Sequence, residues 1–90
     1  MLFKKNIKTE FKELIELLKS ILFKEEDIKI VEDFILHGEE PLAIEHVITQ
    51  LYEFDVIINL DTYRKIEGIA TSLKIKKTGY QILEELIKWN

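Results

Sequence analysis

The segment that decides the fold is residues 25–54, which read EEDIKIVEDFILHGEEPLAIEHVITQLYEF. On both sides of Gly38, apolar residues recur at steps of three and four, a pattern typical of amphipathic helices. Gly38 suits the left-handed position after the last turn of a helix, and Pro41 suits the first turn of the next. We therefore predict two helices joined by a tight turn and packed as neighbours.

The rest of the chain extends this helical pattern in both directions. An apolar stripe before residue 25 predicts a first helix, Asp61 is expected to cap a fourth, and Thr78 with Gln81 forms a capping-box pair that opens a fifth. Residues 55–60 are β-branched and alternate poorly, which indicates an extended connector that packs inward. The predicted fold is all-α, a compact single-domain bundle of about five short helices over residues 1–90. The expected core residues are Ile7, Phe11, Leu14, Ile15, Leu18, Ile21, Leu22, Ile28, Val31, Phe34, Ile35, Ala43, Ile44, Val47, Ile48, Leu51, Tyr63, Ile66, Ile69, Ala70, Leu73, Leu83, Leu86, Ile87 and Trp89.

Composition narrows the class of protein. Apolar residues make up 47% of the 90 residues and charged residues 33%, an ordinary globular balance that argues against disorder. The absence of cysteine favours a reducing compartment, so we expect a cytoplasmic protein. No apolar region follows Lys4 and Lys5 as a signal peptide requires, and no apolar run is long enough for a membrane span.

Catalytic and metal-binding patterns are weak. Ser20 and Ser72 lack the glycines of a nucleophile elbow, and no glycine-rich phosphate loop occurs. His37 and His46 do not have the spacing of a metal site, so we expect a helix C-terminal residue and a surface residue, respectively. We predict that the protein is not an enzyme and that it needs no metal or cofactor.

Charge is strongly segregated along the chain. The middle segment, defined as residues 25–61, holds eleven Asp or Glu and a single Lys. Residues 1–24 and residues 62–90 each carry six Lys or Arg against three Glu, although the net charge of the whole chain is only −4. Such a concentration of carboxylates suits the steering of a cationic partner.

Two structural explanations compete with a binding role. Helix N-termini favour acidic residues for dipole reasons, and the basic flanking helices can fold back and neutralise the middle segment internally. Glu45, Glu53 and Asp55 gain nothing from the dipole, which favours function. Tyr52 is the best aromatic anchor for a partner, with a half-buried position at the core edge as the alternative. The predicted partner-binding residues are Glu39, Glu40, Glu45, Tyr52, Glu53, Asp55 and Asp61.

Five short motifs stand out within residues 30–75: Ile35-Leu-His-Gly-Glu-Glu, Leu42-Ala-Ile-Glu, Leu51-Tyr-Glu-Phe-Asp, Ile57-Ile-Asn-Leu and Tyr63-Arg-Lys-Ile. In these motifs the segment resembles the MafI family of bacterial immunity proteins. Pro41 departs from the aromatic-Gly pair that the family more often has at this turn. The resemblance implies a small helical protein that binds and neutralises a cognate secreted toxin of contact-dependent inhibition or a related polymorphic toxin system. The toxin is expected to be a basic nuclease, with an EndoU-like RNase as one target, whose substrate groove an acidic face covers.

Two other functions stay open at this point. One is an acidic adaptor or anti-repressor of a basic transcription factor. The other is a small nucleic-acid-binding regulator that uses its basic outer helices, with phosphate contacts from Lys4, Lys5, Lys8, Lys12, Lys74, Lys76 and Lys77. A DNA-reading helix-turn-helix at residues 25–54 is disfavoured, because its second helix has no Lys or Arg. Leu36 and Trp89 are candidate contacts of a homodimer.

Overall fold

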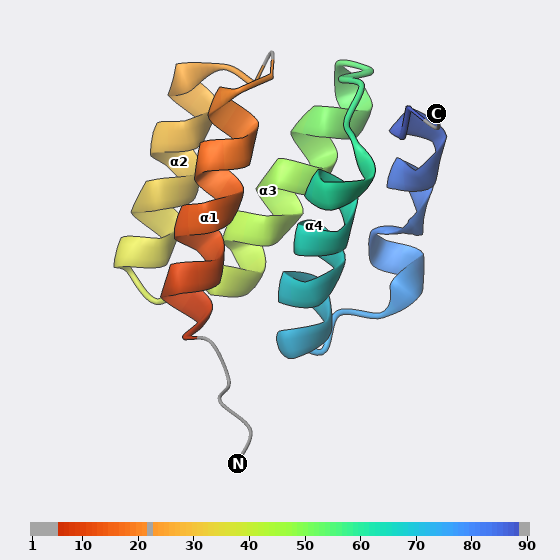
Figure 1. Cartoon of the computed structure of the whole chain (residues 1–90). Coiled ribbons are helices and arrows are strands. Elements are labelled where there is room, and N and C mark those ends of the chain that lie inside the picture. The colour runs from red at the N-terminus through yellow and green to blue at the C-terminus, as the bar shows by residue number, and fades with distance from the viewer. Residues whose placement is uncertain (1–5, 22, 89–90) are drawn as a thin grey trace.

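The computed structural model describes residues 6–21 and 23–88, whose arrangement is shown in Figure 1. Its α-helices are α1 (Ile7–Lys19), α2 (Glu25–Leu36), α3 (Glu40–Glu53) and α4 (Leu60–Ser72). Two 3-10 helices follow, η1 (Lys77–Gly79) and η2 (Gln81–Leu86). Helices α2 and α3 pack as an antiparallel hairpin behind α1 and α4, and η2 lies against α3. The predicted all-α class is confirmed.

Helix α1 begins and ends as its sequence favours. Asn6 is its N-cap, and the Asn6 side-chain oxygen accepts the backbone N–H of Lys8 at 2.8 Å. This bond satisfies one of the donors that the first turn of a helix leaves free. Phe11, Leu14 and Leu18 are fully buried on one face. Their spacing of three and four residues is the reason that a single stripe of the helix meets the core.

Three of the α-helices end in a residue with left-handed backbone conformation. These residues are Gly38 after α2 (φ 72°), Asp55 after α3 (φ 49°) and Lys74 after α4 (φ 62°). In each case the next backbone N–H reaches back to a carbonyl five residues earlier, which defines a Schellman motif. The three bonds are Glu39 to Phe34 (2.8 Å), Val56 to Leu51 (3.0 Å) and Ile75 to Ala70 (2.9 Å). The sequence pattern predicts only the glycine, because Asp and Lys are not typical of this position.

Two predicted caps are wrong. The cap of α4 is Asn59, whose side-chain oxygen accepts the N–H of Thr62 at 2.8 Å, whereas Asp61 lies in the first turn of the helix. Asn and Asp are equally good caps, so the sequence around residue 60 allows either start. Thr78 and Gln81 form no capping box, because Thr78 lies inside η1 and no side chain caps η2.

The expected fifth helix is a 3-10 helix instead of an α-helix. Its buried residues are Leu83 and Leu86, and its N-cap Tyr80 is buried as well, so each of the three is three positions from the next. A 3-10 helix has three residues per turn, so this spacing brings all three side chains to one face. The spacing of the apolar residues therefore accounts for the type of helix that forms.

The connector between α3 and α4 is extended and joins the C-terminal part of the chain. Ile58 is 1% exposed and makes an isolated parallel bridge with Ile87. The Ile58 N–H donates to the carbonyl of Leu86 at 3.0 Å, and the Lys88 N–H donates to the carbonyl of Ile58 at 2.9 Å. The inward packing predicted for this connector is confirmed at Ile58, while Ile57 points outward and is 64% exposed.

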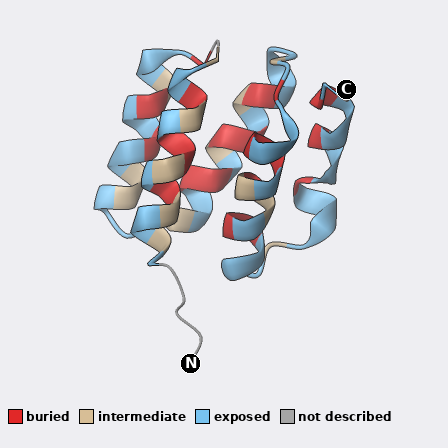
Figure 2. Ribbon diagram, viewed as in Figure 1, coloured by how far each residue is buried: buried red, intermediate tan, exposed pale blue. Residues whose placement is uncertain are grey.

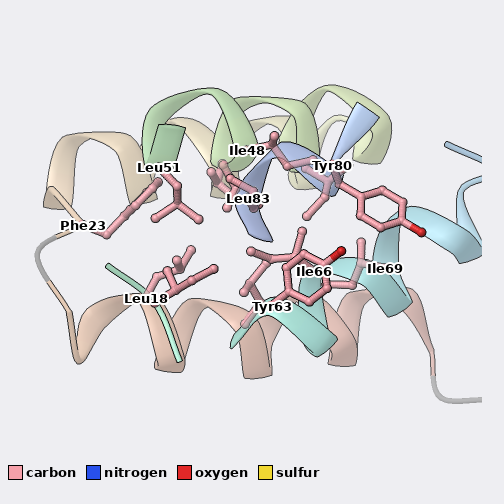
Figure 3. Close-up of a cluster of buried hydrophobic side chains, with 14 of the residues drawn as sticks. Leu18, Phe23, Ile48, Leu51, Tyr63, Ile66, Ile69, Tyr80 and Leu83 are labelled. Carbon is pink, nitrogen blue, oxygen red and sulfur yellow. The ribbon is translucent and has the colours of Figure 1, made fainter. Parts of the chain in front are cut away.

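The core lies between the two pairs of helices. The buried positions face one another across the bundle (Figure 2), and Figure 3 shows Leu18, Leu51, Ile66 and Leu83 meeting there. Most of the predicted core residues are buried or packed against this cluster. Phe23 and Tyr80 are buried although the helical pattern does not select them. Leu22 and Trp89 lie outside the described residues.

Candidate protein-interaction surface

Helix α3 positions most of the predicted partner-binding residues. Five residues of α3, Ala43, Ile44, Val47, Ile48 and Leu51, are buried and fix its inner face. Leu42, Glu45, Thr49 and Glu53 follow one another at steps of three, four and four along the outer face, and all four are exposed. Side chains at this spacing lie in one row on a helix. We call these four residues the α3 ridge.

Tyr52 lies beside the α3 ridge and is 40% exposed. The aromatic residue is therefore accessible to a partner instead of closing the edge of the core. Glu45 is exposed, and no described neighbour bonds to its carboxylate. One face of α3 thus carries both exposed apolar side chains and exposed carboxylates.

The remaining predicted residues do not join a single cluster. Glu39 and Glu40 stand at the start of α3, and Asp55 follows its end. A helix of 14 residues separates these two groups by about 20 Å. Asp61 lies on another helix, in the first turn of α4. The predicted site is therefore a long acidic face with two ends, not one focused cluster of carboxylates.

Most carboxylates of the middle segment have no counter-charge in the part of the chain that the structure describes. There, only Asp27 and Asp33 have a partner that can carry a positive charge, and each partner is a histidine. The other nine make no ion pair or hydrogen bond through their side chains within residues 6–21 and 23–88. They are Glu25, Glu26, Glu32, Glu39, Glu40, Glu45, Glu53, Asp55 and Asp61. Internal neutralisation by the flanking helices does not take place in this part of the chain.

The flanking helices pair their charges with each other. Lys65 on α4 donates to Glu10 at 2.7 Å and to Glu13 at 2.6 Å, both on α1. The side chain of Lys65 is only 21% exposed. The hydrogen bonds to Glu10 and then Glu13 raise the pKa of Lys65 above its ordinary value. The lysine therefore joins α1 to α4 and is not available to the middle segment.

The two histidines form hydrogen bonds within the α2–α3 hairpin. His46 on α3 is partly buried, and its Nε2 donates to Asp27 Oδ1 on α2 at 3.0 Å, so the predicted surface position is wrong. Phe34 packs against the same ring, with centroids 6.5 Å apart. His37 ends α2 as predicted, and its Nδ1 donates to the carbonyl of Asp33 at 2.8 Å. That hydrogen bond, followed by the Asp33 charge, raises the pKa of His37.

A pocket of about 470 Å³ opens where α3 ends, next to the turn between α1 and α2. Its lining is mainly apolar and includes Ile21, Phe23, Phe54, Val56 and Ile57. The polar lining residues are Lys24, Asp27, Gln50 and Asp55. Sequence reasoning missed this pocket, although Phe54 and Ile57 give a signal: they are large apolar residues just outside a helix, and they are 58% and 64% exposed.

Lys24 occupies part of this pocket. Its Nζ lies 4.7 Å from the centre of the Phe54 ring, a cation–π arrangement. The carbonyl end of α3 lies at the same place, because Phe54 is the C-cap of that helix. The last turn of α3 contains no basic residue that would offset its negative dipole end. The pocket therefore combines an aromatic face, aliphatic walls and negative charge.

Comparisons with known proteins identify no relative of this chain: no family model, no curated protein and no solved structure matches it. None of the helices in the described ranges is long and apolar enough to cross a membrane. Across the same ranges, no group of three or more His, Asp or Glu side chains is placed to hold a metal ion.

Proposed function

We propose that this protein is an immunity protein, which binds a basic toxin domain and covers its active groove with the outer face of α2 and α3. The observation that carries the proposal is the set of nine carboxylates in the middle segment that have no side-chain partner within residues 6–21 and 23–88. Uncompensated like charges repel one another and destabilise a folded chain, so a cationic partner is the natural source of compensation.

The surface has the anatomy of a protein interface. Leu42, Tyr52 and Phe54 expose apolar area between the carboxylates of α3 and its C-terminal turn, with 45%, 40% and 58% exposure. Interfaces bury an apolar centre inside a polar rim, and tyrosine is enriched among the residues that dominate binding. Steering by the carboxylates would speed association, and burial of the apolar residues would slow dissociation.

A nuclease is the class of toxin that this surface fits best. Nucleases hold a phosphate backbone with Lys and Arg, and a carboxylate row on an inhibitor can take the place of those phosphates. The resemblance of residues 30–75 to the MafI immunity family supports the same class, with an EndoU-like RNase as the specific candidate. The protein would act by occupying the groove, without any chemistry of its own.

Co-expression with the toxin domain encoded beside this chain tests the proposal. Wild-type protein should restore growth and co-purify with the toxin, whereas E45K/E53K should weaken binding by at least about tenfold because two contacts change sign. The matched control is E16K/E85K, which makes the same charge change at exposed positions on α1 and η2. Equal protection by E45K/E53K and wild type would contradict the proposal.

The same proteins distinguish the nucleic-acid alternative. If the basic outer helices bind RNA or DNA, a gel-shift titration of the wild type will show binding that falls steeply with salt. K8E/K12E, which reverses two exposed lysines of α1, would then abolish that binding. The immunity proposal expects no gel shift at moderate salt, and it expects full protection by K8E/K12E.

A further inference from the structure

We infer that the pocket at the end of α3 receives an arginine side chain of the partner protein, with the guanidinium stacked on Phe54 between Asp55 and Asp27. The inference deepens the proposed function and rests on it for the identity of the partner as a basic protein. It concerns residues that lie mostly outside the predicted partner-binding set.

The first argument is that the structure already seats a cation there. Lys24 Nζ lies 4.7 Å from the centre of the Phe54 ring but makes no ion pair with Asp27 or Asp55, both of which line the same pocket. The ring face therefore accepts a positive charge. The Asp55 carboxylate has no partner among the described residues, and Asp27 bonds His46 through Oδ1 only, so both can still meet an incoming cation. An incoming cation can replace an exposed lysine at little cost, because lysine returns easily to water.

The second argument concerns the negative charge around the pocket. Asp55 follows the C-terminal end of α3, where the helix dipole is negative and repels a carboxylate. Its φ of 49° is a conformation that glycine or asparagine adopts more readily. Asp55 is thus an unfavourable choice for the stability of the fold, on both electrostatic and conformational grounds. A cation that binds beside Asp55 would offset this unfavourable charge.

The third argument separates arginine from lysine and from an uncharged side chain. The walls formed by Ile21, Val56 and Ile57 are apolar, and they suit a long aliphatic stem. A guanidinium is planar and weakly hydrated, so it stacks on an aromatic face and loses less on entering an apolar pocket than an ammonium does. A neutral side chain would leave the carboxylates without a counter-charge. Charge complementarity therefore selects arginine among the side chains that fill such a pocket.

A methyl NMR titration of the full-length protein with three capped tripeptides tests the inference. The peptides are Gly-Arg-Gly, Gly-Lys-Gly and Gly-citrulline-Gly, the last being neutral and nearly the same shape as arginine. We expect saturable shifts of the Val56 and Ile57 methyl groups with the arginine peptide, weaker binding of the lysine peptide and no saturation with citrulline. Equal binding of the arginine and citrulline peptides, or no shift at about 10 mM peptide, overturns the inference.

Variants locate the binding and separate it from folding. Phe54→Ala should lower the affinity for the arginine peptide by at least fivefold. Leu36→Ala, a truncation at an exposed apolar residue of α2, should leave that affinity unchanged. Asp55→Asn should lower the affinity while raising the unfolding midpoint, a combination that a purely structural role does not produce. Lys24→Met should tighten binding by removing the internal competitor. An unchanged affinity of Phe54→Ala for the arginine peptide would contradict the proposed stacking on Phe54.

Failure of this inference and failure of the proposed function give different results. If E45K/E53K loses toxin protection while Phe54→Ala binds the toxin normally, the immunity function stands and the arginine pocket is wrong. If the arginine peptide binds at Phe54 while E45K/E53K still protects, the pocket stands and the acidic face is not the toxin-binding surface.

Discussion

Helices α1 and α4 differ from helices α2 and α3 in how they treat their charges. Lys65 bonds Glu10 and Glu13 across the α1–α4 contact, and Arg64 and Lys19 each have a glutamate three residues away on their own helix. In the middle segment, by contrast, the carboxylates have two histidine partners and no Lys or Arg partner among the described residues. Similar residue types thus serve internal cohesion in one region and stay open to solvent in the other.

The difference separates charges that stabilise the fold from charges that are free to bind a partner. Charges that hold a fold together are expected to have partners within hydrogen-bond distance, and removing one partner should cost stability. Neutralising charges that bind a partner outside the chain is expected to leave the stability of the fold unchanged or to raise it. Paired substitutions in the two regions can test this contrast.

The largest effect is expected for Lys65→Met. The variant leaves Glu10 and Glu13 without their shared cation in a partly buried position, and we expect the free energy of unfolding to fall by about 1–3 kcal/mol. Urea denaturation measures the change. The control is Lys29→Met, since the one lysine of the middle segment has no partner among the described residues and its replacement should change stability by less than about 0.5 kcal/mol. Equal losses in both variants would remove the contrast between the regions.

The next largest effect is expected for Tyr63→Phe, again in a flanking helix. The Tyr63 hydroxyl donates to Glu84 at 3.0 Å, so its removal should lower the free energy of unfolding by about 1 kcal/mol at neutral pH. Burial first, and then the bond to Glu84, raise the pKa of Tyr63 to about 12 from an ordinary value of 10. The fold therefore favours the protonated phenol, and its stabilising contribution is present below pH 10 and disappears as the pH rises toward 12.

Thermal unfolding at a series of alkaline pH values tests the second part of that prediction. The wild type should lose stability more steeply than Tyr63→Phe between pH 10 and 12, because only the wild type must keep a proton on this hydroxyl. Parallel curves for the two proteins would contradict the prediction.

Asp55→Asn should act in the opposite direction, with a smaller magnitude. Asparagine keeps the tolerance for the left-handed conformation and removes the charge next to the negative end of α3, so stability should rise by about 0.3–1 kcal/mol. The matched change in the other region is Glu67→Gln, which removes the negative charge that Arg64 meets at 3.1 Å and should give no gain in stability. A loss of stability in Asp55→Asn, measured by urea denaturation, would show that its carboxylate supports the fold.

The sequence predicts the architecture well because its signals are local. Apolar spacing locates all four α-helices, and Gly38 and Pro41 mark the turn at the centre of the decisive segment. The same spacing does not tell Asn59 from Asp61 as a cap, since both side chains suit the position. The left-handed conformation of Asp55 and Lys74 cannot be predicted in this way, because Asp and Lys are not typical of the position that follows a helix.

The candidate site is only partly predictable for a related reason. Charge counting finds the acidic middle segment, and helical spacing finds the outer position of Glu45 and Glu53. Neither reveals which carboxylates acquire partners, because the bond between Asp27 and His46 joins residues nineteen positions apart. The pocket at Phe54 is likewise lined by segments that are distant in the chain, with Ile21, Phe23 and Lys24 on one side and residues 54–57 on the other. Such features depend on how the helices meet.

The central claim is that nine carboxylates of the middle segment have no counter-charge within the described residues, and the salt dependence of unfolding tests it most directly. Between about 20 and 300 mM NaCl, screening should weaken their repulsion, so the unfolding midpoint of the wild type should rise. The variant E45Q/E53Q/D55N should rise less, because three of the repelling charges are gone. A wild-type midpoint that falls with salt, or equal slopes for the two proteins, would mean that the charges are internally compensated and would contradict the account.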